Sequence, residues 1–315
     1  MPTRCCVFCL NEFSSKGIGE HVIPEAMGGV ILLKDVCPSC NNDLNNRIDN
    51  VFCSDFLNQV KRYTLGLADK RGKVARQPFQ QVVQADSGTN VRLDDNFVPR
   101  VIPRVELKEI NEGFELSVSV DRSLEDKLEQ IVFNKIERFV REREGGVASR
   151  KQRLIAQRIT QDVLDTTKKS YKKEHPGQLH FQQLIDLKVH LLEYVKIAYE
   201  MWCMHNGEDF IYGDDGNFFR DILQKGDVDN ISGQLGFPGL DFLNFDSNKH
   251  YVIVSEWTCY IRLLDLPCLI ARPGFVMNGS SIDEGAIYIN DPVTKRVESK
   301  EFVEFIKEFT QEHNK

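Results

Sequence analysis

Long apolar runs are absent from this sequence of 315 residues. No stretch of about eighteen consecutive apolar residues occurs, which argues against a helix that spans a membrane. The segment from Met1 to Asn11 also lacks the apolar core of a secretory signal, and neither internal repeats nor low-complexity segments occur. With 41% hydrophobic and 28% charged residues, the composition is that of a globular protein, which we expect in the cytoplasm.

An excess of positive charge is also lacking, since the formal net charge is −7. The charge is unevenly spread, however. Residues 1–76 hold ten Lys and Arg against eight Asp and Glu, whereas the remainder holds 30 against 39. Nucleic acids are contacted through local basic patches and not through net charge. One basic segment, equally consistent with a solvated surface, contains Lys61, Arg62, Lys70, Arg71, Lys73 and Arg76.

The nine cysteines cluster at one end of the chain, with six of them in the first 53 residues. In a reducing compartment such clustering indicates a metal site and not disulfides. Cys203, Cys259 and Cys268 lie in apolar or mixed stretches and are expected to be small buried side chains.

Two Cys-x-x-Cys pairs stand out among these cysteines. Cys6 and Cys9 form the first pair, Cys37 and Cys40 form the second, and 27 residues separate them. Four thiolates of this kind suit a closed, tetrahedral and therefore structural zinc site. Cys5 is an alternative first ligand, but Cys6 repeats the spacing of the second pair.

A second motif lies between and after the pairs. It comprises Glu20-His21, the turn from Pro24 to Gly29 with its Gly-Gly end, and Asn41 directly after Cys40. Together with the cysteine pairs, this pattern over residues 5–55, about a sixth of the chain, resembles the HNH endonucleases of the ββα-metal type. It is most similar to the subset with Glu-His in place of Asp-His.

The resemblance implies a strand–loop–strand–helix module that hydrolyses phosphodiester bonds. His21 would act as the general base, because a neutral imidazole accepts a proton from water near pH 7. Glu20 and Asn41 would supply oxygen ligands to one Mg²⁺ or Mn²⁺. The zinc would hold together the two segments that carry these residues.

The sequence departs from the family pattern at one position. The middle Asn of that pattern would fall in residues 30–36, where no Asn occurs. Asp35 or a backbone carbonyl could orient His21 instead. Asn42 is expected to be a surface or capping group, while Asp49 is equally suited to a salt bridge and to the metal.

The remaining sequence predicts an α+β protein with three parts: the module over 1–64, a basic link with short strands over 65–121, and a mixed domain for recognition, dimerisation or regulation over 122–315. A period-two pattern predicts a strand near 113–120. Helical spacing predicts helices from about 123, over about 151–169, over about 181–205, and from about 299. Residues 206–248 are expected to be mostly loops. Strands are expected at 251–257, 260–264, 268–272 and 286–289.

Three functional hypotheses follow from these patterns. The first is a metal-dependent DNA endonuclease, in restriction or phage defence by family analogy, with RNA as another substrate and a homodimer as one route to double-strand cleavage. The second is a zinc-containing nucleic-acid-binding module without catalysis. The third is a protein-interaction module. Metal-dependent cleavage separates the first from the others, and salt-sensitive DNA binding separates the second from the third.

Overall fold

The structure, a computed structural model, describes residues 3–14, 19–69, 71–111, 113–143, 150–168, 170–171, 177–236, 240, 243–275 and 285–313. The chain forms two compact units. The first comprises residues 1–78 and 183–315, and the second comprises residues 79–182. This division differs from the boundaries expected after residues 64 and 121. The cause is a long helix over residues 187–211, which shares one apolar core with the N-terminal module.

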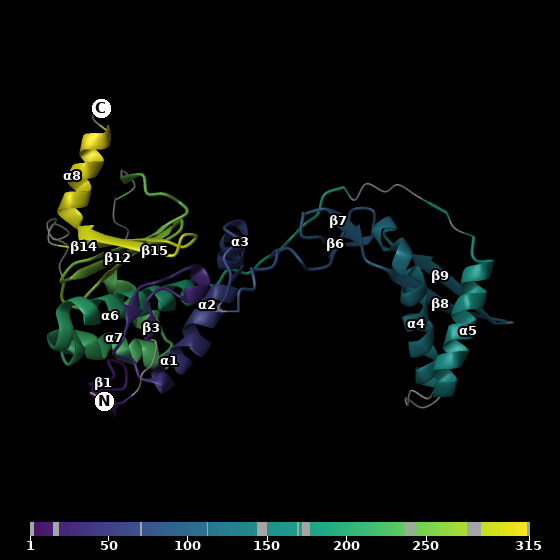
Figure 1. Cartoon of the computed structure of the whole chain (residues 1–315), viewed down its shortest axis with the longest axis horizontal. Coiled ribbons are helices and arrows are strands. Elements are labelled where there is room, and N and C mark those ends of the chain that lie inside the picture. Colours follow the sequence, from purple (N-terminus) through teal and green to yellow (C-terminus); the bar gives the residue numbers. More distant parts are fainter. Residues whose placement is uncertain are drawn as a thin grey trace. The chain divides into compact units, whose positions relative to one another are not determined.

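The N-terminal module has the strand–loop–strand–helix order that the sequence predicts (Figure 1). Both hairpins are antiparallel. In chain order its elements are β1 (Arg4–Cys5), β2 (Glu12–Phe13), β3 (Glu20–His21), the 3-10 turn η1 (Glu25–Met27), β4 (Leu32–Leu33), α1 (Pro38–Leu44), the π-helical turn η2 (Asn45–Asp49), α2 (Asn50–Ser54) and α3 (Phe56–Thr64).

Sequence features define the start of α1 and the end of the loop before β4. Cys37 caps α1 by accepting a hydrogen bond from the Cys40 amide, and proline follows at the first helical position, where its missing N–H is not needed. At the loop, Gly28 has a φ of +80°, and a Cβ at Gly29 would lie 1.9 Å from the Ile23 carbonyl oxygen. The Gly-Gly pair is therefore required by backbone conformation and by close packing.

The C-terminal part of the first unit is a six-stranded antiparallel sheet between helices (Figure 1). The strand order is β10-β13-β12-β11-β14-β15. The elements are α6 (Leu187–Ile211), α7 (Asp214–Lys225), the 3-10 turn η4 (Asp229–Gln234), β10 (Leu235–Gly236), β11 (His250–Val254), β12 (Thr258–Leu263), β13 (Leu266–Ala271), β14 (Ala286–Asp291), β15 (Arg296–Glu301) and α8 (Phe302–His313).

Alternation along the strands divides the apolar residues between the two faces of this sheet. On β11, Val252 and Val254 belong to the core shared with α6, whereas Tyr251 and Ile253 belong to a second core that packs against α8. The first core also contains the buried residues of the module. One face of the sheet thus supports α6, and α6 in turn supports the module.

The loop between β3 and β4 is bound directly by the sheet. His250 of β11 donates from Nε2 to the Met27 carbonyl oxygen at 2.9 Å. The Asn290 amide of β14 donates to the Gly28 carbonyl at 3.0 Å and accepts from the Val30 amide at 3.1 Å. The segment that follows His21 is therefore fixed by strands more than 200 residues later in the chain.

The second unit combines small sheets with a helical pair. It contains the three-stranded sheet β5-β6-β7, the hairpin β8–β9, and the packed helices α4 and α5 around Val132, Ile136 and Ala156. The bounds are β5 (Val83–Gln84), β6 (Asn90–Leu93), β7 (Pro99–Val101), β8 (Arg104–Ile110), β9 (Gly113–Ser119), the 3-10 turn η3 (Arg122–Lys127), α4 (Leu128–Arg143) and α5 (Arg150–Thr166).

The α+β class and most expected elements are confirmed, with two corrections. The helix expected from residue 181 begins only at Leu187, after the capping Asp186, so Leu184 is 90% exposed and lies outside the apolar stripe. Residues 206–248 are not mostly loops, because α6 extends to Ile211 and α7 follows. The Gly, Asp and Asn residues that suggested loops include helix starts and ends, such as Gly226 at the end of α7.

His250 generates a prediction about stability. Its side chain is fully buried, and burial lowers its pKa to about 4, below the usual 6.5. The folded state therefore favours the neutral ring. Its contribution to stability is complete above pH 6.5 and declines as the pH falls from 6.5 to 4. We expect the free energy of unfolding to lose up to about 3 kcal/mol across this range through this group.

The measurement is urea denaturation of wild type and His250→Gln between pH 7 and 4. Glutamine keeps a donor for the Met27 carbonyl but does not titrate. The unfolding free energy of wild type minus that of His250→Gln should decrease as the pH falls. A difference that stays constant across this range would contradict the prediction.

Candidate active site

Four cysteine sulfurs form a compact cluster in the module. The Sγ atoms of Cys6, Cys9, Cys37 and Cys40 all lie within 4.8 Å of one another, a geometry that could hold one metal ion. Two backbone amides point at these sulfurs, from Cys37 to Cys6 Sγ at 3.3 Å and from Cys40 to Cys37 Sγ at 3.5 Å. Such amides favour the thiolate form that a metal requires.

Cys5 lies outside this cluster although it precedes Cys6. Its thiol donates to the Leu10 carbonyl at 3.3 Å and accepts from the Tyr212 hydroxyl at 3.4 Å. The two neighbours therefore have different surroundings. On α1, Asn41 directly follows the cluster residue Cys40.

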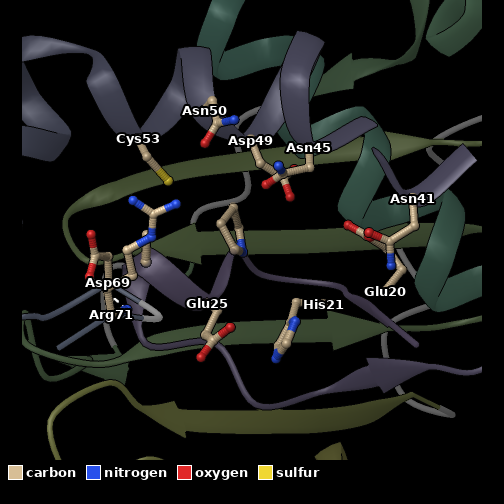
Figure 2. A pocket seen from close by; sticks show the side chains of 12 residues that line it. Glu20, His21, Glu25, Asn41, Asn45, Asp49, Asn50, Cys53, Asp69 and Arg71 are labelled. Atoms are coloured by element: carbon tan, nitrogen blue, oxygen red, sulfur yellow. Dashed lines mark hydrogen bonds between the residues drawn. The ribbon is translucent and has the colours of Figure 1, made fainter. Parts of the chain in front are cut away.

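Glu20, His21 and Asn41 line one pocket of about 210 Å³ (Figure 2). β3 supplies the first two side chains and α1 supplies the third. The pocket is rich in acidic and amide groups, and Arg71 is the one cationic side chain among its described lining residues. The other polar residues around it are Glu25, Asn45, Asp49, Asn50 and Asp69.

The amide of Asn41 has a defined orientation. Its Nδ2 donates to the Gly19 carbonyl at 3.0 Å, which directs the nitrogen to β3 and leaves Oδ1 as the acceptor atom. Glu20 lines the same pocket (Figure 2). The pocket thus offers one carboxylate and one amide oxygen, the kinds of ligand that a hard divalent cation prefers.

Glu20 is only 2% exposed and faces a buried cation. The Nζ of Lys196 lies 2.9 Å from Glu20 Oε1. Burial raises the pKa of Glu20, and the Lys196 charge opposes that rise. Burial alone would lower the pKa of Lys196, but the carboxylates around it outweigh this effect and hold its pKa well above the usual value. Lys196 is therefore a buried, protonated partner of a candidate metal ligand.

The segment that lacks the family's middle Asn pairs with β3 through its backbone. Leu32 lies opposite His21 in the antiparallel register, and the Val22 amide donates to the Ile31 carbonyl at 3.0 Å. The side chain of Asp35 is 53% exposed and lies 3.9 Å from Arg4.

The two other polar candidates lie in different places. Asn42 is exposed and does not line the pocket, as expected for a surface group. Asp49 lines the pocket and is also ion-paired, with Oδ1 at 2.7 Å from the Lys196 Nζ. Both readings that the sequence allowed for Asp49 are therefore compatible with its position.

The sequence interpretation missed three charged residues of α6. Glu193, Lys196 and Glu200 are completely buried in a helix interpreted only as an apolar stripe. Burial raises the pKa of Glu193 and Glu200 well above its usual value, which favours their neutral forms. The available signal was charge at positions i, i+3 and i+7 within a long apolar run, since charged residues are rarely buried without a partner.

The basic segment after the cysteines is partly used in folding. Arg62 donates to the carbonyls of Ala26 and Cys53, and Lys61 is paired with Asp265. Arg71 instead lines the pocket. Lys70 lies outside the described residues.

The paired hairpins, α1, the sulfur cluster and the adjoining pocket define a ββα module with a candidate metal centre. The HNH endonuclease family model matches residues 6–57, so this segment belongs to the HNH endonuclease family. Comparison with curated proteins and with solved structures found no match. Among the described residues, no helix is both long enough and apolar enough to cross a membrane.

The sulfur cluster generates a prediction about metal content. We expect one tightly bound metal ion per chain, because four converging thiols without a cation would be costly to ionise. Cys6→Ser should lose this ion, whereas the neighbouring Cys5→Ser should keep it. Elemental analysis of the purified proteins by mass spectrometry measures both. Equal losses in the two variants would contradict the assignment of Cys6.

Proposed function

We propose that this chain is a metal-dependent endonuclease that hydrolyses phosphodiester bonds in DNA. The observation that carries the proposal is the meeting of Glu20, His21 and Asn41 in one pocket of the family-matched module. A histidine beside two oxygen ligands provides the two functions that phosphodiester hydrolysis requires, a base for water and a place for a cation.

In this proposal His21 accepts the proton of the attacking water. Glu20 and Asn41 hold one Mg²⁺ or Mn²⁺, and the four cysteines hold a structural zinc. When bound, the divalent cation supplies charge relief for the phosphate and for the leaving oxygen. The chain's own contribution is orientation: α1 presents Asn41, while β3 presents Glu20 and His21 from adjacent positions.

The charge of the pocket supports a requirement for metal. Glu20, Glu25, Asp49 and Asp69 line it, and Arg71 is the one lining cation in the described structure. This surrounding repels a phosphate group by itself and attracts a divalent cation. A nucleic-acid backbone would therefore be accepted once a cation has reduced the negative charge.

The substrate and setting follow from weaker observations. We favour DNA as the substrate because of the family to which the module belongs, and the cleavage assay includes RNA as the alternative substrate. One module cuts one strand, so a double-strand break would need a second, separate cleavage of the opposite strand or a second copy of the chain. Restriction or antiviral defence is the setting we propose, and only the family resemblance supports it.

The direct test is cleavage of a supercoiled plasmid by purified protein with Mg²⁺, Mn²⁺ or EDTA. We expect nicking with metal, none with EDTA, and a loss of at least about a hundredfold in His21→Ala, because general base catalysis contributes that much or more. His180→Ala, an exposed histidine of the second unit, is the matched control and should cut like wild type.

The outcomes of this test are distinct. Cleavage that persists in EDTA or in His21→Ala, and that disappears when the proteins are prepared from a nuclease-free host, would indicate a contaminating nuclease. No cleavage of plasmid, modified phage DNA or RNA would reject the nuclease and favour a second candidate, a binding module without catalysis. The engagement of Glu20 by Lys196 is the observation that favours this candidate. Salt-sensitive DNA binding would support it, and no binding would leave a protein-interaction module.

Arg71 provides a further prediction about binding. As the cation that lines the pocket, it is placed to meet a phosphate. Arg71→Ala should weaken DNA binding for all sequences and should reduce the slope of log K against log salt by about one. Lys61→Ala is the control, because its ammonium is paired with Asp265. Fluorescence anisotropy over a range of salt, with the His21→Ala background to prevent cleavage, measures both slopes. Equal slopes in the two variants would contradict this role of Arg71.

A further inference from the structure

Lys196 makes three polar contacts with the module from outside it. It lies in the middle of α6, and its side chain is completely buried. Its Nζ lies 2.7 Å from Asp49 Oδ1 and 2.9 Å from Glu20 Oε1, and it donates to the His21 carbonyl oxygen at 3.1 Å. Nζ thus donates hydrogen bonds to Asp49 and to the His21 carbonyl, and it forms an ion pair with Glu20.

These acceptors belong to the two segments that carry the candidate catalytic groups. Glu20 and His21 form β3, whereas Asp49 ends the π-helical turn that continues from α1, the helix of Asn41. The sulfur cluster joins the start of α1 to the β1–β2 hairpin. Lys196 joins the far end of the same helical run to β3, so the pocket is fixed at two separate points.

We propose that Lys196 is a positioning residue, which holds the backbone of His21 and the carboxylate of Glu20 in the geometry needed for cleavage. The inference rests on the proposed function. It names a specific donor for the strand of His21, in a sequence that has no Asn between residues 30 and 36. Lys196 is buried, so it acts through Glu20 and His21 and does not itself touch the substrate.

The alternative is a purely structural ion pair. A structural pair would lower stability when removed but would leave the pocket unchanged in molecules that remain folded. A positioning residue makes a different prediction, because a small displacement of a catalytic group lowers the turnover number without a matching change in substrate binding. The two possibilities are therefore separated by the split between kcat and KM and by local protection of β3.

The main variant is Lys196→Met, which keeps the length of the side chain and removes the ammonium. We expect kcat to fall about a hundredfold with KM within about threefold of wild type. We also expect the amides of residues 20–22 and 31–33 to exchange with solvent at least about tenfold faster, since β3 has lost its donor. Hydrogen exchange measured by mass spectrometry needs no activity, so this arm is informative whether or not the protein cuts DNA.

Two variants of the same helix serve as controls. Lys188→Met removes an exposed lysine paired with Asp229, and Tyr194→Phe removes one partly buried hydrogen bond, to the Leu266 carbonyl. Neither touches the pocket. Both should keep the wild-type kcat and the wild-type protection of β3, although Tyr194→Phe should lower the melting temperature.

A double variant tests the proposal if Lys196→Met leaves two unpaired carboxylates and fails to fold. Lys196→Met with Asp49→Leu replaces the buried pair by apolar groups, which proteins often tolerate. It should fold and still show the low kcat and fast exchange of β3. Asp49→Asn alone keeps Lys196 against Glu20 and His21, and should retain protection of β3.

Each outcome has one meaning. Wild-type kcat and wild-type protection of β3 in a folded Lys196 variant would overturn the proposal. An equal loss of kcat in Tyr194→Phe at the same melting temperature would overturn it as well, since the effect would then follow stability. A wild-type protein that cuts no nucleic acid rejects the proposed function, and the exchange of β3 then decides the role of Lys196 by itself.

Discussion

The burial of the middle of α6, residues 193–203, on all sides is the constraint on which the first unit depends. A helix at the surface needs one apolar stripe, whereas α6 is covered by the sheet on one side and by the N-terminal module on the other. Trp202, Tyr199 and Met201 are all completely buried although they lie on different sides of the helix. The module alone has too few residues to bury a comparable core, so α6 supplies the surface on which it folds.

Charged residues within such a helix carry a large desolvation cost. An isolated ammonium would be unstable there, and Lys196 is tolerated because carboxylates from two other segments surround it. Apolar residues of the same volume would usually be at least as stable. Stability is therefore a poor explanation for this cluster, and the specific geometry that it imposes on β3 is the better one.

The sequence is sufficient to predict the local features of the site. The Cys-x-x-Cys pairs, Glu20-His21, the Gly-Gly turn and Asn41 each act through neighbours within a few residues, and the structure has the ββα order that they indicate. The role of α6 could not be predicted in this way, because Lys196 and Asp49 are separated by 147 residues. Periodicity identified α6 as core but gave no information about which element would cover it.

The same limit applies to the division of the chain into compact units. Residues 79–182 form a separate unit inserted between the module and α6, so two segments that share one core are far apart in sequence. Composition changes along the chain suggested boundaries, whereas the contacts of α6 and of the strand residues His250 and Asn290 join the module to the C-terminal sheet across this distance in sequence.

The acidic character of the chain is compatible with the proposed nuclease activity once the charge of the pocket is considered separately from the total charge. Carboxylates concentrated around a site of cleavage select for a cation first, and the cation then provides the positive charge that the phosphate requires. Lys196 limits this effect, because it neutralises part of the charge of Glu20 without being exposed to the substrate. A buried lysine therefore reduces the negative potential of the pocket without offering the phosphate a competing contact, so a bound cation and Arg71 remain the positive groups at which the nucleic-acid backbone can be held.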